Sequence, residues 1–293
     1  MKEAKYDRYV LNKYPKLTGK KALVTGATGS IGFAVARYLL LLGADVSITY
    51  RNLTKAKEVK DKLEAEFNKE VKIHHLDLSD IDEVKSFPDS LKEPIDILFN
   101  VAGTYHLDKK IVNNNYELTF LSDFLSVAWL NRGFLRLNKK MTIINTGSVS
   151  MYYSHVDFAD IMSIQVKNKT VRYGRDKRLL AIDTLNLKES YPEAKIILAH
   201  PGVSATSLFE PSKGGFNKAF KAVIFPLMKV IFMSPEKASL SILNGLITKD
   251  DGEYISAPRG FLHSWGYPKM VKLRKSLLNS KEKDKLKSIY NTL

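Results

Sequence analysis

The chain has 293 residues, 44% of them hydrophobic, and 46 lysines and arginines against 31 aspartates and glutamates give it a formal charge of +15. This length and apolar content suffice for one large core. The absence of cysteine excludes disulfides, thiol catalysis and cysteine-ligated metal, and the six histidines show no metal-ligand spacing, so we expect no metal site.

The N-terminal residues, 1–19, alternate charge with tyrosine and lack the apolar core of a secretory signal. We interpret them as a short arm. The rest of the chain, 20–293, contains no long linker and no internal repeat, which predicts a single domain.

Three glycines, Gly26, Gly29 and Gly32, lie between a short apolar run at 22–25 and an apolar pattern of helical spacing that begins at Phe33. The run predicts a strand buried on both faces, and the pattern predicts its crossover helix. Glycines in such a turn let the backbone approach a pyrophosphate at the helix N-terminus, although a glycine-rich loop can also be a simple tight turn. The placement between strand and helix favours dinucleotide binding.

The remaining chain repeats the alternation of strand and helix. Strands are predicted at 45–50, 71–75, 95–100, 141–146, 195–200 and 254–257, and helices at 55–67, 80–87, 116–130 and 171–187. This alternation predicts an α/β fold, a Rossmann-type doubly wound parallel sheet of about seven strands in a three-layer α/β/α sandwich. Functional residues are then expected directly after the strands.

Polar residues do follow the strands. Arg51 follows the second one, where folds that prefer NAD usually carry a carboxylate, and a guanidinium there favours NADP(H) over NAD(H) unless it is only a surface arginine. After the third strand, Asp77 is expected to bond the adenine amino group or to cap the next helix with Ser79. After the fourth, Asn100 and Gly103 are expected to let the backbone pass close to the cofactor.

A candidate proton donor lies in the helix predicted at 171–187. Tyr173 and Lys177 are four residues apart and therefore share one face of this helix. Hydride transfer to a carbonyl requires a proton donor and a polarised oxygen, and a nearby ammonium lowers the pKa of a phenol. Ser148, just past the fifth strand, can donate to the same oxygen or can cap a helix.

These motifs, in this order, resemble those of the short-chain dehydrogenase/reductase family, and within it the branch similar to retinol dehydrogenase and protochlorophyllide reductase. The resemblance runs from about residue 20 to the end of the chain. It rests on residues 25–32, Arg51 with Asn52, residues 76–78, Asn100 with Ala102 and Gly103, residues 143–148, Tyr173 with Lys177, and residues 200–202 followed by Thr206.

The resemblance implies a dehydrogenase or reductase that acts on a carbonyl or alcohol with a nicotinamide cofactor. It implies that Tyr173 is the general acid or base, that Lys177 holds the nicotinamide ribose and that Ser148 positions the substrate carbonyl. A substrate lid is implied at about 205–233. The implied cofactor-binding residues are Gly26, Thr28, Gly29, Ser30, Ile31, Gly32, Arg51, Asn52, Asp77, Leu78, Asn100, Ala102, Gly103, Tyr173, Lys177, Pro201, Gly202 and Thr206.

Some residues depart from the family pattern. Ser30 replaces a glycine of the cofactor loop, Asp176 replaces a serine before the lysine, and Asp123 stands where many members have an asparagine that supports a proton relay. We count Asp123 among the candidate catalytic residues, because a carboxylate there would act on the lysine charge, whereas a relay through the backbone carbonyl would not depend on the side chain. These departures leave an alternative, a catalytically weak NADP-binding regulator or scaffold.

The substrate pocket is expected to be apolar and to suit a lipophilic or aromatic small molecule. Its candidate lining residues, which are also candidate core residues, are Phe158, Met162, Phe209, Phe216 and Phe225.

The basic residues are spread along the chain, with a mild concentration in a basic tail at about 268–293, so we expect no nucleic-acid partner. Lysines and a proline interrupt the apolar segment 216–233, which excludes membrane insertion there but leaves peripheral membrane contact as an alternative. We expect a cytoplasmic homo-oligomer, a dimer or tetramer as is common in the family.

Overall fold

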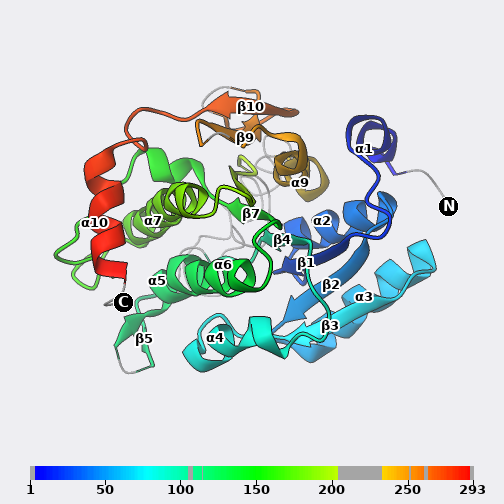
Figure 1. The fold of residues 1–293 in the computed structure, drawn as a ribbon, viewed down its shortest axis with the longest axis horizontal. Helices are drawn as coiled ribbons and strands as arrows, with labels where there is room; N and C mark the ends of the chain where they lie inside the picture. The colour runs from blue at the N-terminus through cyan, green and yellow to red at the C-terminus, as the bar shows by residue number, and fades with distance from the viewer. Residues whose placement is uncertain are drawn as a thin grey trace, which may run out of the picture.

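An eight-stranded sheet with helices on both faces organises the chain (Figure 1). The structure is a computed structural model that describes residues 4–104, 108–113, 115–203, 233–250, 252–260 and 263–290. The strands are β1 (Lys21–Thr25), β2 (Asp45–Tyr50), β3 (Val71–His75), β4 (Ile97–Asn100), β7 (Thr142–Thr146), β8 (Lys195–Ala199), β9 (Tyr254–Pro258) and β10 (Pro268–Lys272), in the order β10-β9-β8-β7-β4-β1-β2-β3. Every pairing is parallel except that of β10 with β9.

The helices connect the strands and cover the sheet. They are α1 (Asp7–Lys13), α2 (Ser30–Leu41), α3 (Leu53–Phe67), α4 (Ile81–Ser90), α5 (Leu118–Phe120), the π-helical segment η1 (Leu121–Leu125), α6 (Ser126–Leu137), the 3₁₀ turn η2 (Val149–Tyr152), α7 (Lys169–Ser190), α9 (Pro235–Leu243), the 3₁₀ turn η5 (Asn244–Ile247) and α10 (Ser280–Tyr290). A small hairpin of β5 (Ile111–Val112) and β6 (Tyr116–Glu117) stands outside the main sheet.

The strand residues alternate between two hydrophobic cores because successive side chains point to opposite faces of a sheet. In β1, Ala22 and Val24 pack with α2 and α9, whereas Leu23 packs with α4 and α6 on the other face. The pairs Leu98 with Phe99 and Ile143 with Ile144 divide in the same way. Burial on both faces explains why these strands are continuous apolar runs.

The strand order reverses its direction of winding between β1 and β4, which are neighbours in the sheet. In an open parallel sheet such a switch point leaves a crevice at the carboxyl ends of the strands. The turn after β1 and the loop after β4 meet there, so the fold places its ligand site at this edge.

The predicted Rossmann-type three-layer fold is confirmed, but the sheet has eight strands where about seven were predicted. The eighth, β10, has the sequence Pro-Lys-Met-Val-Lys, in which no apolar run marks a strand. It is the edge strand and pairs only with β9, and lysines are typical of protected sheet edges. Residues 116 and 117, predicted to be helical, form β6 instead.

Both ends of the chain pack against the domain. The segment interpreted as an arm contains α1, whose Val10 is buried in the same core as α2 and whose Asp7 forms an ion pair with Arg37 of α2. The basic segment 268–293 supplies β10 and α10, and Leu286 of α10 is buried against α7 and the helical segment before α6. These ends therefore contribute to the core rather than extend from it.

Candidate active site

The turn after β1 has the geometry of a phosphate cradle. Gly26 adopts a positive φ of 73°, and a Cβ on it would lie 2.6 Å from Cα of Ala102. A Cβ on Gly32 would lie 2.7 Å from the carbonyl carbon of Gly26, so both positions exclude a side chain. Gly29 precedes α2, and no side chain caps the first turn of that helix. The uncapped N–H groups of such a turn are suited to bind an anion.

The other residues predicted in this turn line its outer side. Gly29 and Ser30 are exposed, whereas Thr28 and Ile31 are half-buried. Ser30, which departs from the family glycine, is the first residue of α2 and has an exposed side chain. The serine therefore causes no crowding in the turn.

A threonine joins the turn to the neighbouring loop. Thr25 Oγ1 at the end of β1 accepts hydrogen bonds from the N–H groups of Val101 and Ala102 after β4, at 3.1 and 3.2 Å. The loop at 101–104 is thereby held against the glycine turn. This role of Thr25 is not visible in the sequence, because its hydrogen bonds reach residues 76 and 77 positions away.

Asn100 lies below the loop rather than in it. Its side chain is buried and donates to Oδ1 of Asn131 and Oδ1 of Asn145, at 2.7 and 2.8 Å. Asn145 in turn donates to Thr184 of α7 at 3.0 Å. Asn100 thus ties β4 to β7, α6 and α7, and only its backbone is placed to pass near a cofactor.

The residues predicted near the adenosine end lie after β2. Arg51 is exposed at the end of β2. Asn52 caps α3, because its side chain accepts a hydrogen bond from the N–H group of Lys55 at 3.0 Å. Of these two residues, Arg51 therefore has the side chain available to a ligand.

Asp77 and Leu78 follow β3. The carboxylate of Asp77 accepts hydrogen bonds from the backbone and hydroxyl of Ser79, at 2.8 and 2.7 Å, but it does not cap α4. Asp80 is the residue that caps α4 itself. The backbone carbonyl of Leu78 accepts from Ser126 of α6 at 2.7 Å, so this loop is fixed to the helix beside it.

The candidate proton donor and its lysine lie in the first turns of α7. Tyr173 is half-buried, and the ammonium of Lys177 lies 5.7 Å from the centroid of its ring. The ammonium also donates to the carbonyl of Thr146, at the carboxyl end of β7, at 3.2 Å. Ser148 follows β7 by two residues, and its Oγ accepts from Oγ of Ser150 at 3.0 Å. Three of the four predicted catalytic side chains, those of Ser148, Tyr173 and Lys177, thus lie where β7 ends against α7.

Asp123 is buried in the π-helical segment η1 and faces the same lysine. One of its oxygens lies 3.7 Å from Nζ of Lys177. Thr104 donates to its carboxylate twice, from the N–H group at 2.8 Å and from the hydroxyl at 2.9 Å. Thr104 was not predicted from the sequence, and its position directly after Ala102 and Gly103 of the β4 loop is the signal that could have indicated it.

The residues predicted at the nicotinamide end follow β8. Gly202 has a φ of 78° and donates to Nδ1 of His200 at 3.2 Å, and a Cβ on it would lie 2.5 Å from the carbonyl oxygen of Ser264. Burial, with a smaller effect of His263, lowers the pKa of His200 to about 3, so this histidine stays neutral and structural. Pro201 is half-buried beside it. Thr206 and residues 205–232 of the predicted lid lie outside the described residues.

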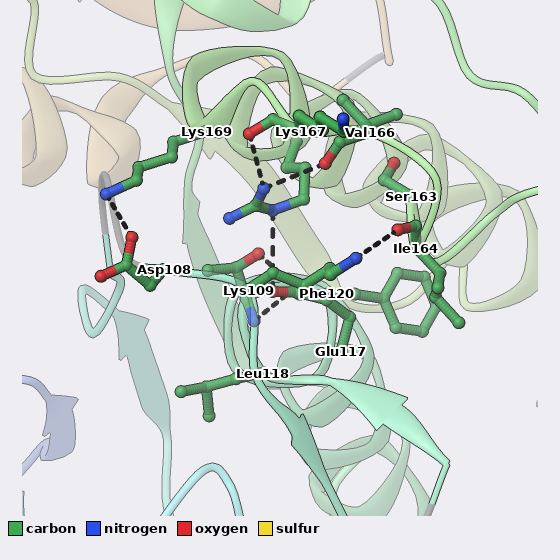
Figure 2. A network of polar contacts seen from close by, with 12 residues as sticks. Asp108, Lys109, Glu117, Leu118, Phe120, Ser163, Ile164, Val166, Lys167 and Lys169 are labelled. Atoms are coloured by element: carbon green, nitrogen blue, oxygen red, sulfur yellow. Dashed lines mark hydrogen bonds and ion pairs between the residues drawn. The ribbon is translucent and has the colours of Figure 1, made fainter.

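The segment 153–168, between η2 and α7, is held against the segment that leads into the β5–β6 hairpin. Figure 2 shows Lys169 in an ion pair with Asp108 at 2.6 Å and Lys109 donating to the carbonyl of Ile164 at 3.0 Å. Phe158 and Met162 of segment 153–168 pack against the core cluster of Phe120. We therefore place these two side chains at the core, and the other three predicted lining residues lie outside the described ranges.

A second contact in the same network crosses the protein interior. Arg172 of α7 donates to the carbonyls of Val166 and Lys167, and its Nε lies 3.6 Å from a carboxylate oxygen of Glu117. The other oxygen of Glu117 accepts from the N–H group of Phe120 at 3.0 Å, as Figure 2 shows. These contacts connect the start of α7, which contains Tyr173, to residues 117–120.

The sequence of this chain is similar to those of known proteins. Residues 20–159 match the family model described as short chain dehydrogenase. An uncharacterized oxidoreductase of Schizosaccharomyces pombe is 27% identical over 283 residues, which are 87% of this chain and 83% of that protein. Mouse retinol dehydrogenase 14 is 29% identical over 210 residues, 65% of this chain and 63% of that enzyme.

A solved structure has a similar fold. It is a short-chain dehydrogenase from Burkholderia cenocepacia J2315 in complex with NADP, with a TM-score of 0.61 and 23% sequence identity over 81% of this chain and 94% of that one.

Proposed function

We propose that the chain is a member of the short-chain dehydrogenase/reductase family and that it transfers hydride between NADP(H) and a carbonyl or alcohol, with Tyr173 as the general acid or base. The observation that carries the proposal is the position of Tyr173 and Lys177 on α7. There they lie against the end of β7, beside the loop that Thr25 holds to the glycine turn. The proposed proton donor and the proposed dinucleotide cradle therefore lie at one edge of the sheet.

The residues present fit a dinucleotide. The glycine turn has no room for side chains at Gly26 and Gly32, and the first turn of α2 has no capping side chain, which suits a pyrophosphate. Lys177 is proposed to hold the nicotinamide ribose, and Pro201 and Gly202 are proposed to lie at the nicotinamide end. The bound cofactor would supply the hydride.

Tyr173 and its neighbours are proposed to handle the proton. When a carbonyl carbon accepts hydride, its oxygen gains negative charge and takes the hydroxyl proton of Tyr173, which leaves a phenolate that solvent reprotonates. Ser148 is proposed to donate a hydrogen bond to the same oxygen. The ammonium of Lys177 favours the phenolate because opposite charges attract. Alcohol oxidation reverses these steps.

The substrate is proposed to be an apolar alcohol or aldehyde. The relative named retinol dehydrogenase 14 takes its name from a lipophilic alcohol and matches 65% of this chain. Phe158 and Met162 pack against the core, so this relative, rather than those side chains, supports the proposal of an apolar substrate.

Assembly and location are proposed separately from the chemistry. No helix within the described ranges is long and apolar enough to cross a bilayer. A cytoplasmic location and a homo-oligomer stay predictions. The outer side of α7 is covered by α10, through ion pairs that include Arg178 with Glu282 at 2.6 Å, so other surfaces are proposed for contacts between copies.

The first experiment is a fluorescence titration of the purified protein with NADPH and NADH. A panel of apolar aldehydes, ketones and alcohols then follows in the same cuvette. We expect NADPH to bind, and at least one panel member to change the nicotinamide absorbance. Binding without turnover across the panel would favour the regulator alternative, and binding of neither nucleotide would refute the proposed cofactor site.

Arg51→Ala is expected to weaken NADPH binding by about 10- to 100-fold and to change NADH binding by less than about twofold. The reason is that a guanidinium forms charge-assisted hydrogen bonds with a 2′-phosphate, which NADH lacks. Titration of both nucleotides measures the effect. Arg136→Ala is the matched control, since Arg136 is an exposed arginine paired with Asp89 at the end of α6. Equal losses for both nucleotides in Arg51→Ala would refute the proposed NADP preference.

A further inference from the structure

Asp123 lies in a part of the protein from which water is excluded. Its carboxylate is buried, and η1 is a π-helical segment within an otherwise α-helical stretch, a rare geometry that often occurs at functional sites. Both of its oxygens are held by Thr104, and the ammonium of Lys177 lies 3.7 Å from one of them. The carboxylate therefore has a fixed orientation toward the lysine.

The loop after β4 is shaped to lie over this ion pair. A Cβ on Gly103 would lie 2.9 Å from Oδ1 of Asp123 and 3.3 Å from Nζ of Lys177. Only glycine allows Thr104, the next residue, to reach the carboxylate from this direction. The loop proposed to contact the cofactor thus also orients Asp123.

Two more buried carboxyls lie near Asp123, and their surroundings differ. Glu117 forms an ion pair with Arg172 of α7. Within the described residues, neither oxygen of Asp176 has a hydrogen-bond partner. Burial, and then the charges of Asp123 and Glu117, raise the pKa of Asp176 well above its ordinary value, which favours the protonated form.

The surroundings of Asp123 stabilise a negative charge better than those of Asp176 do. Burial raises the pKa of Asp123 above its ordinary value, but Lys177 and the hydrogen bonds from Thr104 oppose that rise. In the alkaline range, where a phenol loses its proton, Asp123 is therefore expected to be a carboxylate.

We propose that Asp123 is a positioning residue that acts through Lys177. Its carboxylate holds the ammonium in place and offsets part of the positive field that reaches Tyr173. An ammonium alone stabilises the phenolate, and an adjacent carboxylate reduces that stabilisation, so the pair shifts proton transfer toward more alkaline pH. This inference rests on the proposed function, because it assigns the pH dependence of the same site.

The test is the pH dependence of alcohol oxidation, whose rate rises as the phenol of Tyr173 loses its proton. Asp123→Asn keeps the shape of the side chain and removes its charge. We expect the inflection of the pH profile to move down by about one pH unit, because the field of Lys177 is no longer offset. A role limited to packing would change the rate without moving the inflection.

Asp176→Asn is the matched control. It makes the same chemical change one residue from Lys177, but at a buried carboxyl that we expect to be neutral, so we expect its inflection to stay at the wild-type value. An unmoved inflection in Asp123→Asn, or an equal shift in both variants, would overturn the inference. Absence of any nicotinamide-dependent turnover in the wild-type protein would instead overturn the proposed function, and this inference with it.

A second measurement covers the case in which Asp123→Asn does not fold. Carboxyl carbons of aspartate are followed by ¹³C NMR in the wild-type protein, and Asp176→Asn assigns the signal of Asp176. Besides Asp7 and Asp183, which form ion pairs with arginines, we expect one buried aspartate to be ionised in the alkaline range and the signal of Asp176 to stay protonated. If no buried aspartate other than those in ion pairs with arginine is ionised in the alkaline range, the inference is overturned.

Discussion

Tyr173→Phe is expected to lower the rate of turnover by about 10²- to 10⁴-fold while cofactor binding stays within about twofold of the wild-type value. The change removes the hydroxyl that is proposed to give its proton to the substrate oxygen, and general acid catalysis contributes a factor of this size. It keeps the ring, whose centroid lies 5.7 Å from the ammonium of Lys177. Steady-state kinetics and a fluorescence titration on the same preparation separate the two effects.

The matched control for this variant is Tyr153→Phe. Tyr153 directly follows η2 and is 59% exposed, and its hydroxyl accepts a long hydrogen bond from Arg274 at 3.5 Å. The control is expected to retain wild-type turnover. If Tyr173→Phe retains it as well, another group supplies the proton and the proposed role of Tyr173 is wrong.

Gly32→Ala is expected to destabilise the protein by about 1–3 kcal/mol and to weaken dinucleotide binding by more than about tenfold. A methyl group there would lie 2.7 Å from the carbonyl carbon of Gly26 and 2.9 Å from Cα of Ala27. These are backbone atoms, so the turn must shift to accept the methyl group, and overpacking of this kind costs free energy of this order. Thermal unfolding and NADPH titration measure the two losses.

Gly29→Ala provides the comparison in the same turn. A Cβ at Gly29 would lie 3.4 Å from the carbonyl oxygen of Gly26, which is ordinary contact, so thermal stability is expected to stay near the wild-type value. Equal stability of the two variants would show that the turn is free to rearrange. The cradle would then be less rigid than the close contacts of Gly26 and Gly32 indicate.

Local sequence patterns were sufficient for the central sheet and the cofactor turn. The strands of β1, β4, β7 and β8 are apolar runs because both faces of the sheet are covered, and this makes them visible without a structure. The glycine turn was predictable because its three glycines lie between a recognisable strand and a recognisable helix. The edge strand β10 was missed because its sequence, Pro-Lys-Met-Val-Lys, mixes lysines with apolar residues and contains no continuous apolar run.

The ends of the chain could not be placed from their composition. The segment at 1–19 and the basic segment at 268–293 carry many charges, which is typical of exposed arms and tails. In the structure, Arg37 pairs with Asp7 of α1 and Arg178 with Glu282 of α10, so some of those charges anchor the ends. A partner distant in sequence decides whether a charge lies in solvent or in a contact.

The sequence by itself determined the fold class, the glycine turn and the candidate pair Tyr173 and Lys177, because each is expressed in spacing within one strand, turn or helix. Only the tertiary structure decided what surrounds that pair. Three separate parts of the chain supply Thr104, Asp123 and Lys177. These residues meet because β4 and β7 are neighbours, and because Gly103 has no side chain that would crowd Asp123 and Lys177. The physical reason is that a charge acts through distance in space, which local spacing does not encode.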